Sequence, residues 1–209
     1  MKHGYNTIAA ALASPVDYPA LLDSLLDSDS VAVVADEFFV TQYSLLAELI
    51  RIPFQRGIAH ITILVTDADY RKHHDKLRET LNNAGLNEVD IQLHHADKRE
   101  NLSFLTISAD GDAIGINRVL VDADYVLLVQ EFGRLDKDAH ERFAFYPRFA
   151  DANTIERNKT QNKKHQKQLV QESDNVANEL SIGLFLEYKR GANNHFSYVC
   201  RHNVTRTRV

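Results

Sequence analysis

Three aspartates and one histidine stand where buried strands are expected to end. Asp36, Asp67 and Asp69 follow two short runs of β-branched apolar residues, and His95 follows a third run in which polar residues alternate. In an open parallel sheet the carboxyl ends of the strands meet at one edge, where ligands bind. We therefore expect Asp36, Asp67, Asp69 and His95 to form a candidate ligand cleft. Such a set suits a hard divalent metal or a general base, although helix caps and solvated loops use the same residue types.

Other reactive residue types occur in patterns that favour structural roles. His73 and His74 are neighbours on an expected helix and point about 100° apart, so one should pack and the other should be solvated. The basic run 157–167 could bind phosphate or an acidic partner, but a solvated helix face is the simpler interpretation. It lacks interleaved aromatic residues, which disfavours nucleic acid. Cys200 has no activating neighbour in the sequence and is expected to be a packed residue.

The glycines exclude several common sites. No two of the 8 glycines have GxG spacing, and none precedes Lys-Ser or Lys-Thr. A dinucleotide fingerprint and a P-loop both need close glycines so that the backbone can approach phosphate groups. The GxSxG elbow of serine hydrolases is absent as well.

Composition indicates a soluble globular chain. It has 209 residues, is 44% hydrophobic and 25% charged, and carries a formal net charge of −5, which gives no general reason to bind nucleic acid. No apolar run approaches the roughly 18 residues of a membrane-spanning helix. With one cysteine, an internal disulfide is excluded. We expect no signal peptide and a cytoplasmic location.

Strand and helix patterns alternate along the first half of the chain. Apolar runs predict strands at 31–35, 61–65, 89–93, 104–108, 114–121 and 125–129, and a final pair at 180–188 and 196–200. Helical spacing of leucines predicts helices at 19–26, at 45–53 with Pro53 as the end, and from Asp67 or Asp69 to Gly85. Continuous apolar strands between helices favour an α/β fold with three layers, a mostly parallel sheet and helices on both faces. We expect one domain over 1–209, with a polar, variable segment at 131–179.

The order of short motifs adds a family resemblance. The series is Leu12-Ala13-Ser14-Pro15, Ala35-Asp36, Val65-Thr66-Asp67, His95, Asn117-Arg118, Ala123-Asp124 and the segment 147–158. In this order the chain resembles the N-terminal domain of the nickel-pincer lactate racemase family, over about residues 12–200. The family's glycine-rich segment is missing, and 131–146 is charged and aromatic instead.

The resemblance implies a family site of which little is retained. Asp36 matches a cofactor-binding aspartate of the family, and no other residue of this chain matches the family's site. The other family positions fall on Phe39 in place of an arginine, on Asp69, Lys159 and near Gly133 in place of histidines, and near Phe143 in place of the lysine that carries the cofactor.

These losses bear directly on activity. Racemisation at a hydroxyl-bearing carbon needs a base on each face of that carbon, close to the metal centre. We therefore expect a lactate-racemase-like domain without racemase activity and without the nickel-pincer nucleotide, acting as a binding or partner domain. The alternative is a divergent enzyme that binds a metal or a small ligand in the strand-end cleft. A homodimer and a separate second-domain protein are both open as partners, and no membrane is expected.

Aromatic residues stand where the family has its glycine-rich segment. We expect this segment either to fold back into the vacant cleft or to form a protein contact, most simply an isologous homodimer. Its members are Phe132, Phe143, Phe145, Tyr146 and Phe149.

The loss of the cofactor site can be tested by mass. We predict that the purified protein carries no stoichiometric nickel and no covalent nucleotide-derived adduct, because the lysine position near Phe143 is lost. Intact-mass spectrometry together with metal analysis measures both. A mass excess located on any lysine would contradict the prediction.

Overall fold

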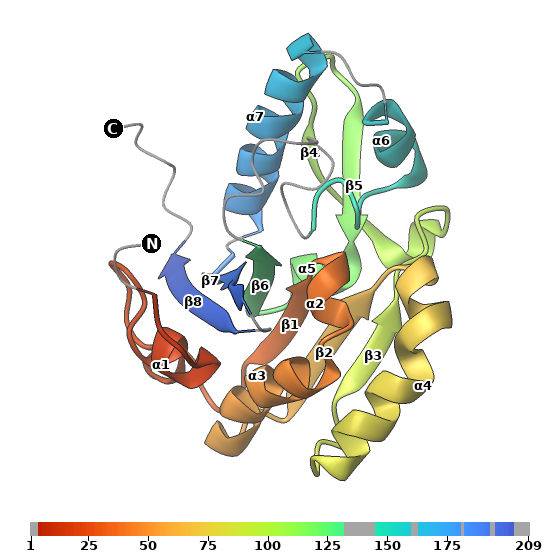
Figure 1. The fold of residues 1–209 in the computed structure, drawn as a ribbon. Coiled ribbons are helices and arrows are strands. Elements are labelled where there is room, and N and C mark those ends of the chain that lie inside the picture. Colours follow the sequence, from red (N-terminus) through yellow and green to blue (C-terminus); the bar gives the residue numbers. More distant parts are fainter. Residues whose placement is uncertain (1–3, 132–144, 160–162, 181, 193–194, 203–209) are drawn as a thin grey trace.

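The computed structural model describes residues 4–131, 145–159, 163–180, 182–192 and 195–202. Its main sheet has six strands in the order β3-β2-β1-β6-β7-β8, all parallel except β8, which runs antiparallel to β7 (Figure 1). The strands are β1 (Ser30–Ala35), β2 (His60–Val65), β3 (Asp90–Leu93), β6 (Tyr125–Glu131), β7 (Leu184–Arg190) and β8 (Phe196–His202). A separate antiparallel hairpin consists of β4 (Leu102–Ile107) and β5 (Ala113–Asn117).

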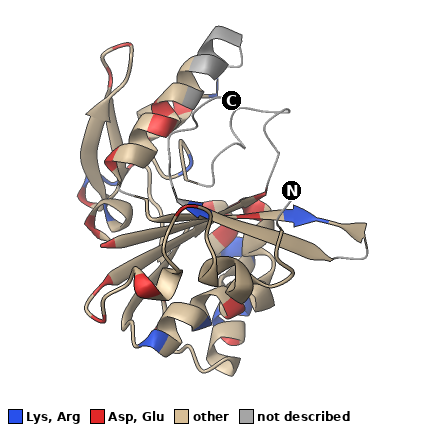
Figure 2. Cartoon of the chain, turned by 90° about the vertical axis from the view of Figure 1, so that its left-hand side faces the viewer, with Lys and Arg blue, Asp and Glu red and all other residues tan. Residues whose placement is uncertain are grey.

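Helices cover both faces of the main sheet, so the predicted three-layer α/β architecture is confirmed. In Figure 2, α7 and the β4–β5 hairpin lie on one side of the sheet, and helices α1 to α4 lie on the opposite side. Acidic and basic residues are scattered over both sides. The helical elements are α1 (Ile8–Ala13), η1 (Leu21–Asp23), α2 (Glu37–Val40), α3 (Tyr43–Arg56), α4 (Asp67–Asn83), η2 (Arg99–Asn101), α5 (Arg118–Asp122), α6 (Ala152–Arg157) and α7 (Lys163–Glu179).

Strict alternation along the strands builds two separate cores. In β1, Val31 and Val33 pack into the first core with α1 to α4, whereas Ala32 and Val34 pack into the second. β6 behaves in the same way, since Leu127 joins the first core and its neighbours join the second. Because successive side chains of a strand point to opposite faces, a continuous apolar run predicts a strand that is buried on both sides.

The chain ends of the described region meet at the edge of the sheet. Tyr5 and Tyr198 exchange two backbone hydrogen bonds, with N–O distances of 2.8 and 2.7 Å. The backbone N–H of Val16 donates to the carbonyl of Cys200 at 2.8 Å. The N-terminal segment therefore covers the outer edge of β8, which would otherwise be open to pairing with other chains.

Three predicted elements were wrong in detail. The leucines of 19–26 form only the 3₁₀ turn η1, and Leu26 is 68% exposed, so this segment has no face long enough to bury as a helix. Helix α3 continues through Pro53 and ends at Gly57, whose φ of 103° suits a left-handed cap. The predicted strand 114–121 ends at Asn117, because the Asn117 side chain accepts from the N–H of Val119 and starts α5.

Three of the predicted aromatic residues fold back onto the sheet. Phe145, Tyr146 and Phe149 are fully buried in the second core, while Phe132 and Phe143 lie outside the described residues. The segment 131–179, predicted to be polar and variable, thus supplies part of the core, and α6 and α7 belong to it. In the part of the chain that the structure describes, no helix is both long and apolar enough to cross a membrane.

The packing of the aromatic segment against the sheet can be tested by removing the ring of Phe145. We predict that Phe145→Ala destabilises the protein by about 3–5 kcal/mol, because it leaves a cavity in the second core. Urea unfolding measures the loss, and light scattering should show an unchanged mass. Leu26→Ala is the control, because that side chain is 68% exposed and its removal should have little effect. A stable Phe145→Ala protein with a smaller mass would instead indicate a dimer contact.

Candidate functional site

Asp36 lies where the strand order of the sheet reverses. After β1 the chain builds β2 and β3 on one side, whereas β6 pairs on the other side of β1. Such a switch point leaves a crevice beyond the carboxyl ends of the two strands, and open α/β sheets bind ligands there. Asp36 follows β1 directly, so its carboxylate lies in this crevice.

The Asp36 carboxylate is occupied by groups of the protein itself. Oδ1 accepts from the N–H of Phe39 at 2.8 Å and caps α2, and Oδ2 accepts from the N–H of Glu131 at 2.9 Å. The hydroxyl of Tyr188 donates to both oxygens at 2.9 Å. Burial and the neighbouring Asp36 charge raise the pKa of Tyr188, so the hydroxyl keeps its proton and remains a donor. Asp36 therefore ties the ends of β1, β6 and β7 together.

Asp69 is also held by the protein. Its carboxylate accepts from the hydroxyl of Thr66 at 2.7 Å and is paired with the guanidinium of Arg148. The same guanidinium donates to the carbonyl of Ala35 at 2.8 Å. Arg148 thus joins the end of β1 to the start of α4, which is capped by Thr66 and not by an aspartate.

A cavity of about 900 Å³ opens beside this junction, at the carboxyl ends of β2 and β3. This volume falls within the usual range for small-molecule sites. The N-terminal turn of α4 forms one wall, the β3–η2 connection forms a second, and the segment around Arg148 with α6 forms a third. The lining residues are Thr66, Asp67, Ala68, Arg71, His94, His95, Ala96, Asp97, Pro147, Arg148, Ile155 and Lys159.

The structure brings two of the four predicted site residues to this cavity. Asp67 and His95 line it, whereas Asp36 and Asp69 are bound to other groups of the protein and are not among the lining residues. A hydrogen bond from Arg71 holds the pKa of the Asp67 carboxyl below its usual value. Among the residues described, no three histidine, cysteine, aspartate or glutamate side chains are grouped as they would be around a metal ion.

The sequence prediction missed His94, which is the buried imidazole of the cavity wall. Its Nε2 donates to the carbonyl of Ala150 at 2.9 Å, and its Nδ1 accepts from the side-chain amide of Asn117 at 3.0 Å. The ring of Phe149 meets it edge-on at 5.6 Å. Because a carbonyl can only accept, the network fixes the Nε2–H tautomer and leaves His94 no free nitrogen. Burial lowers the pKa of His94. The only feature of the sequence that marks this position is that His94 stands directly before a second histidine, His95.

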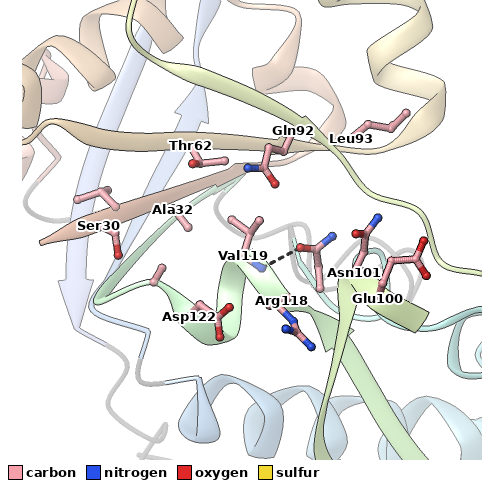
Figure 3. Close-up of a pocket in the computed structure, with 13 residues that line it drawn as sticks. Ser30, Ala32, Thr62, Gln92, Leu93, Glu100, Asn101, Arg118, Val119 and Asp122 are labelled. Atoms are coloured by element: carbon pink, nitrogen blue, oxygen red, sulfur yellow. Dashed lines mark hydrogen bonds between the residues drawn. The ribbon is translucent and has the colours of Figure 1, made fainter. Parts of the chain in front are cut away.

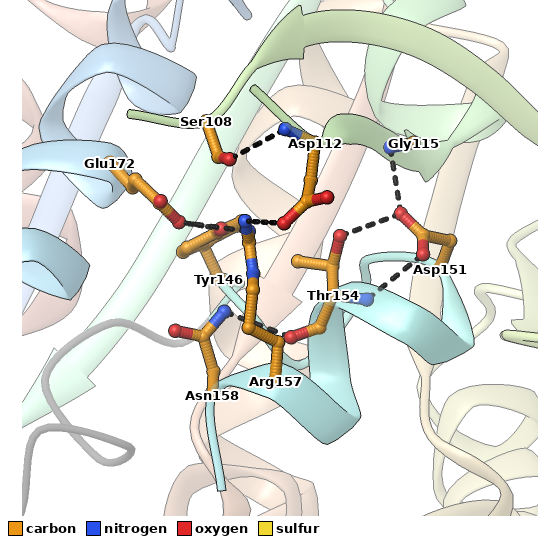
Figure 4. Close-up of polar contacts among 9 residues, drawn as sticks. All are labelled: Ser108, Asp112, Gly115, Tyr146, Asp151, Thr154, Arg157, Asn158 and Glu172. Carbon is orange, nitrogen blue, oxygen red and sulfur yellow. Dashed lines mark hydrogen bonds and ion pairs between the residues drawn. The ribbon is translucent and has the colours of Figure 1, made fainter. Parts of the chain in front are cut away.

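A polar network holds α6, and with it one wall of the cavity, against the β4–β5 hairpin and α7 (Figure 4). Asp151 caps α6 by accepting from the N–H of Thr154 at 2.9 Å, and it also accepts from the N–H of Gly115 at 2.8 Å. Arg157 bridges Asp112 at 3.2 Å and Glu172 at 3.1 Å. The wall is therefore fixed by contacts to elements far away in the sequence.

Histidines and the cysteine elsewhere have structural surroundings. His73 shares a hydrogen bond with the hydroxyl of Tyr43 at 2.8 Å, and His74 stacks on Tyr70 with ring centroids 4.3 Å apart. Both are half-buried, so the prediction of one packed and one solvated ring was wrong. Cys200 is buried as predicted, and burial raises its pKa to about 12.

An open, mostly parallel sheet with a cavity at the carboxyl ends of its strands is the architecture in which α/β domains commonly bind ligands. The family model of the lactate racemase N-terminal domain matches residues 1–132, more than half of the chain. The chain therefore belongs to this family, as the motif order indicated.

A solved structure agrees with this assignment. The lactate racemase apoprotein from Thermoanaerobacterium thermosaccharolyticum matches with a TM-score of 0.65 and 14% sequence identity. The match covers 93% of this chain and 51% of that one, so this chain spans about half the length of that racemase. At this identity the likeness shows a shared fold. A search of the curated proteins finds no match.

The His94 network predicts acid sensitivity. A lowered pKa in the folded state means that the unfolded chain binds more protons, so stability should fall as pH drops below about 6.5. We expect His94→Gln to remove much of this slope, because the amide can keep both hydrogen bonds without titrating. Urea unfolding between pH 5 and pH 8 measures the effect. His60→Gln, at an exposed position, serves as the control, and parallel pH profiles for wild type and His94→Gln would refute the prediction.

Proposed function

We propose that this domain binds a small hydroxy acid in the cavity at the ends of β2 and β3 and does not racemise it. The observation that carries the proposal is the composition of the cavity wall. Arg71 lines the cavity near the N-terminal turn of α4, where backbone N–H groups and the helix dipole favour an anion. Its exposed guanidinium pairs with Asp67, so a bound carboxylate would share or replace that partner. His95, on the neighbouring wall, supplies an imidazole for the ligand's hydroxyl.

The described walls support binding without turnover. Racemisation needs a base on each face of the reacting carbon. Of the two imidazoles at the cavity, His94 has both nitrogens engaged, so the described walls do not offer a pair of free imidazoles. Arg148 is committed to Asp69 and Ala35.

The nickel-pincer group of the family does not fit these donors. Nickel sites in proteins draw on imidazole ligands, and of the two imidazoles at the cavity His94 is engaged, which leaves only His95 for such a role. The position expected for the attachment lysine, near Phe143, lies outside the described residues. We therefore propose that the domain works without this cofactor. We also propose that it works in the cytoplasm.

A partner role is the second candidate. Phe104 and Ile107 of β4 are 66% and 60% exposed, which favours a contact with another protein chain. A second copy of this chain and a separate second-domain protein are the partners consistent with this role. The divergent-enzyme alternative loses support, because only Asp67 and His95 of its four residues share the cavity.

Lactate itself is the first probe. We expect isothermal titration calorimetry to detect binding of D- or L-lactate, and Arg71→Gln to weaken it about tenfold by removing a charge-assisted contact. Arg56→Gln is the matched control, since Arg56 forms a comparable surface ion pair with Asp27 at 2.9 Å, away from the cavity.

Activity is tested in parallel. The protein is incubated with each pure enantiomer and the product is analysed by chiral chromatography. We expect no interconversion. Racemisation by the purified protein would overturn the proposed loss of activity, and the absence of any lactate binding would overturn the proposed ligand.

A further inference from the structure

A second cavity lies between the β1–β3 part of the sheet and the elements α5 and η2. The register places Ala32, Thr62 and Asp90 in one row across β1, β2 and β3, and Leu64 beside Gln92 in the next. These side chains point to the face of the second core, which is apolar over β1 and β6. Leu64 of β2 still belongs to this core, but Thr62, Asp90 and Gln92 make the rest of the face polar over β2 and β3. The second core therefore stops there, and a hollow of about 330 Å³ remains.

Helix α5 and the turn η2 form the opposite wall of this hollow. The Asn117 side chain accepts from the N–H of Val119 at 2.9 Å and so fixes the start of α5 (Figure 3). In Figure 3, Gln92 extends from β3 into the space in front of Val119, and Asn101 lies across from it. Both amides and the Val119 side chain thus border one space.

The polar side chains of this wall are largely unused. Within the described part of the chain, Glu100, Asn101, Arg118 and Asp122 make no side-chain hydrogen bond or ion pair, although all four line the hollow. Gln92 uses only its nitrogen, which donates to Asp90 at 2.8 Å. In the cavity at the ends of β2 and β3, by contrast, Arg71 and Arg148 are both paired.

The wall therefore mixes free donors and free acceptors. Carboxylates of Glu100 and Asp122 accept only, Arg118 donates only, and the amides of Gln92 and Asn101 do both. An anion would face the two carboxylates, and an apolar ligand would make no hydrogen bond with any of these groups. A hydroxyl group both donates and accepts, so a ligand with several hydroxyls can satisfy all of them. Ala32 and Val119 offer an apolar surface for the face of a ring.

We propose that this hollow binds a neutral polyhydroxylated molecule of the size of one monosaccharide. Its volume lies near the lower end of the range for ligand sites, which suits a single ring. This site is separate from the hydroxy-acid cavity, and its occupancy does not depend on the function proposed there.

Saturation-transfer NMR and calorimetry with D-ribose, D-glucose, D-galactose and D-mannose test the site. We expect at least one of these sugars to bind, and Gln92→Leu and Asn101→Leu each to weaken it about fivefold to tenfold. Both positions are at or near the surface, and melting curves verify that the variants fold. Gln55→Leu, on an exposed position of α3, is the matched control and should bind like wild type.

The outcomes separate this proposal from the other site. Binding that persists in Arg71→Gln but is lost in Gln92→Leu supports it. Failure of all four sugars to bind, or binding that neither Gln92→Leu nor Asn101→Leu weakens, overturns it.

Discussion

The carboxylate of Asp36 is the contact on which the architecture of the site depends. It stands between β1 and β6, where the strand order of the sheet reverses and where an open α/β fold would otherwise leave a crevice. Two backbone N–H groups and the Tyr188 hydroxyl converge on it. A buried charge is tolerated only when it is fully hydrogen-bonded, and these donors meet that requirement. Once they are in place, the crevice between β1 and β6 is closed by the protein itself.

Because that crevice is closed, the cavity of this domain lies beside it, at the carboxyl ends of β2 and β3. Arg148 spans from the end of β1 to Asp69, and the chain around it forms the wall of the cavity at β2 and β3. The same segment carries Phe145 and Phe149 into the second core. One stretch of chain thus fills the sheet face and shapes the neighbouring cavity. A domain of the lactate racemase family can in this way keep its sheet while the residues at its strand ends take structural roles.

The sequence predicted the parts of the fold that are encoded locally. Runs such as 31–35 and 125–129 are apolar on both faces, and this pattern identifies a central strand without knowledge of its neighbours. The roles of Asp36 and Asp69 were out of reach, because their partners Tyr188 and Arg148 lie 152 and 79 positions away. The sequence alone shows a carboxylate at a strand end but does not show what faces it. The role of His94 could not be predicted for the same reason, because its partners Asn117 and Ala150 belong to other parts of the chain.

The pairing of Tyr5 with Tyr198 has a consequence for synthesis of the chain. The segment that contains Tyr5 is made before every strand of the main sheet, yet β8, the strand that it covers, comes last among the described strands. Until β7 and β8 emerge, the edge of β6 is unpaired and the carboxylate of Asp36 lacks Tyr188. A nascent chain that has completed β1, β2 and β3 therefore carries an open sheet edge and an unsatisfied charge. The domain closes only after β7 and β8 have been made, and its early intermediates are the species that chaperones would need to protect.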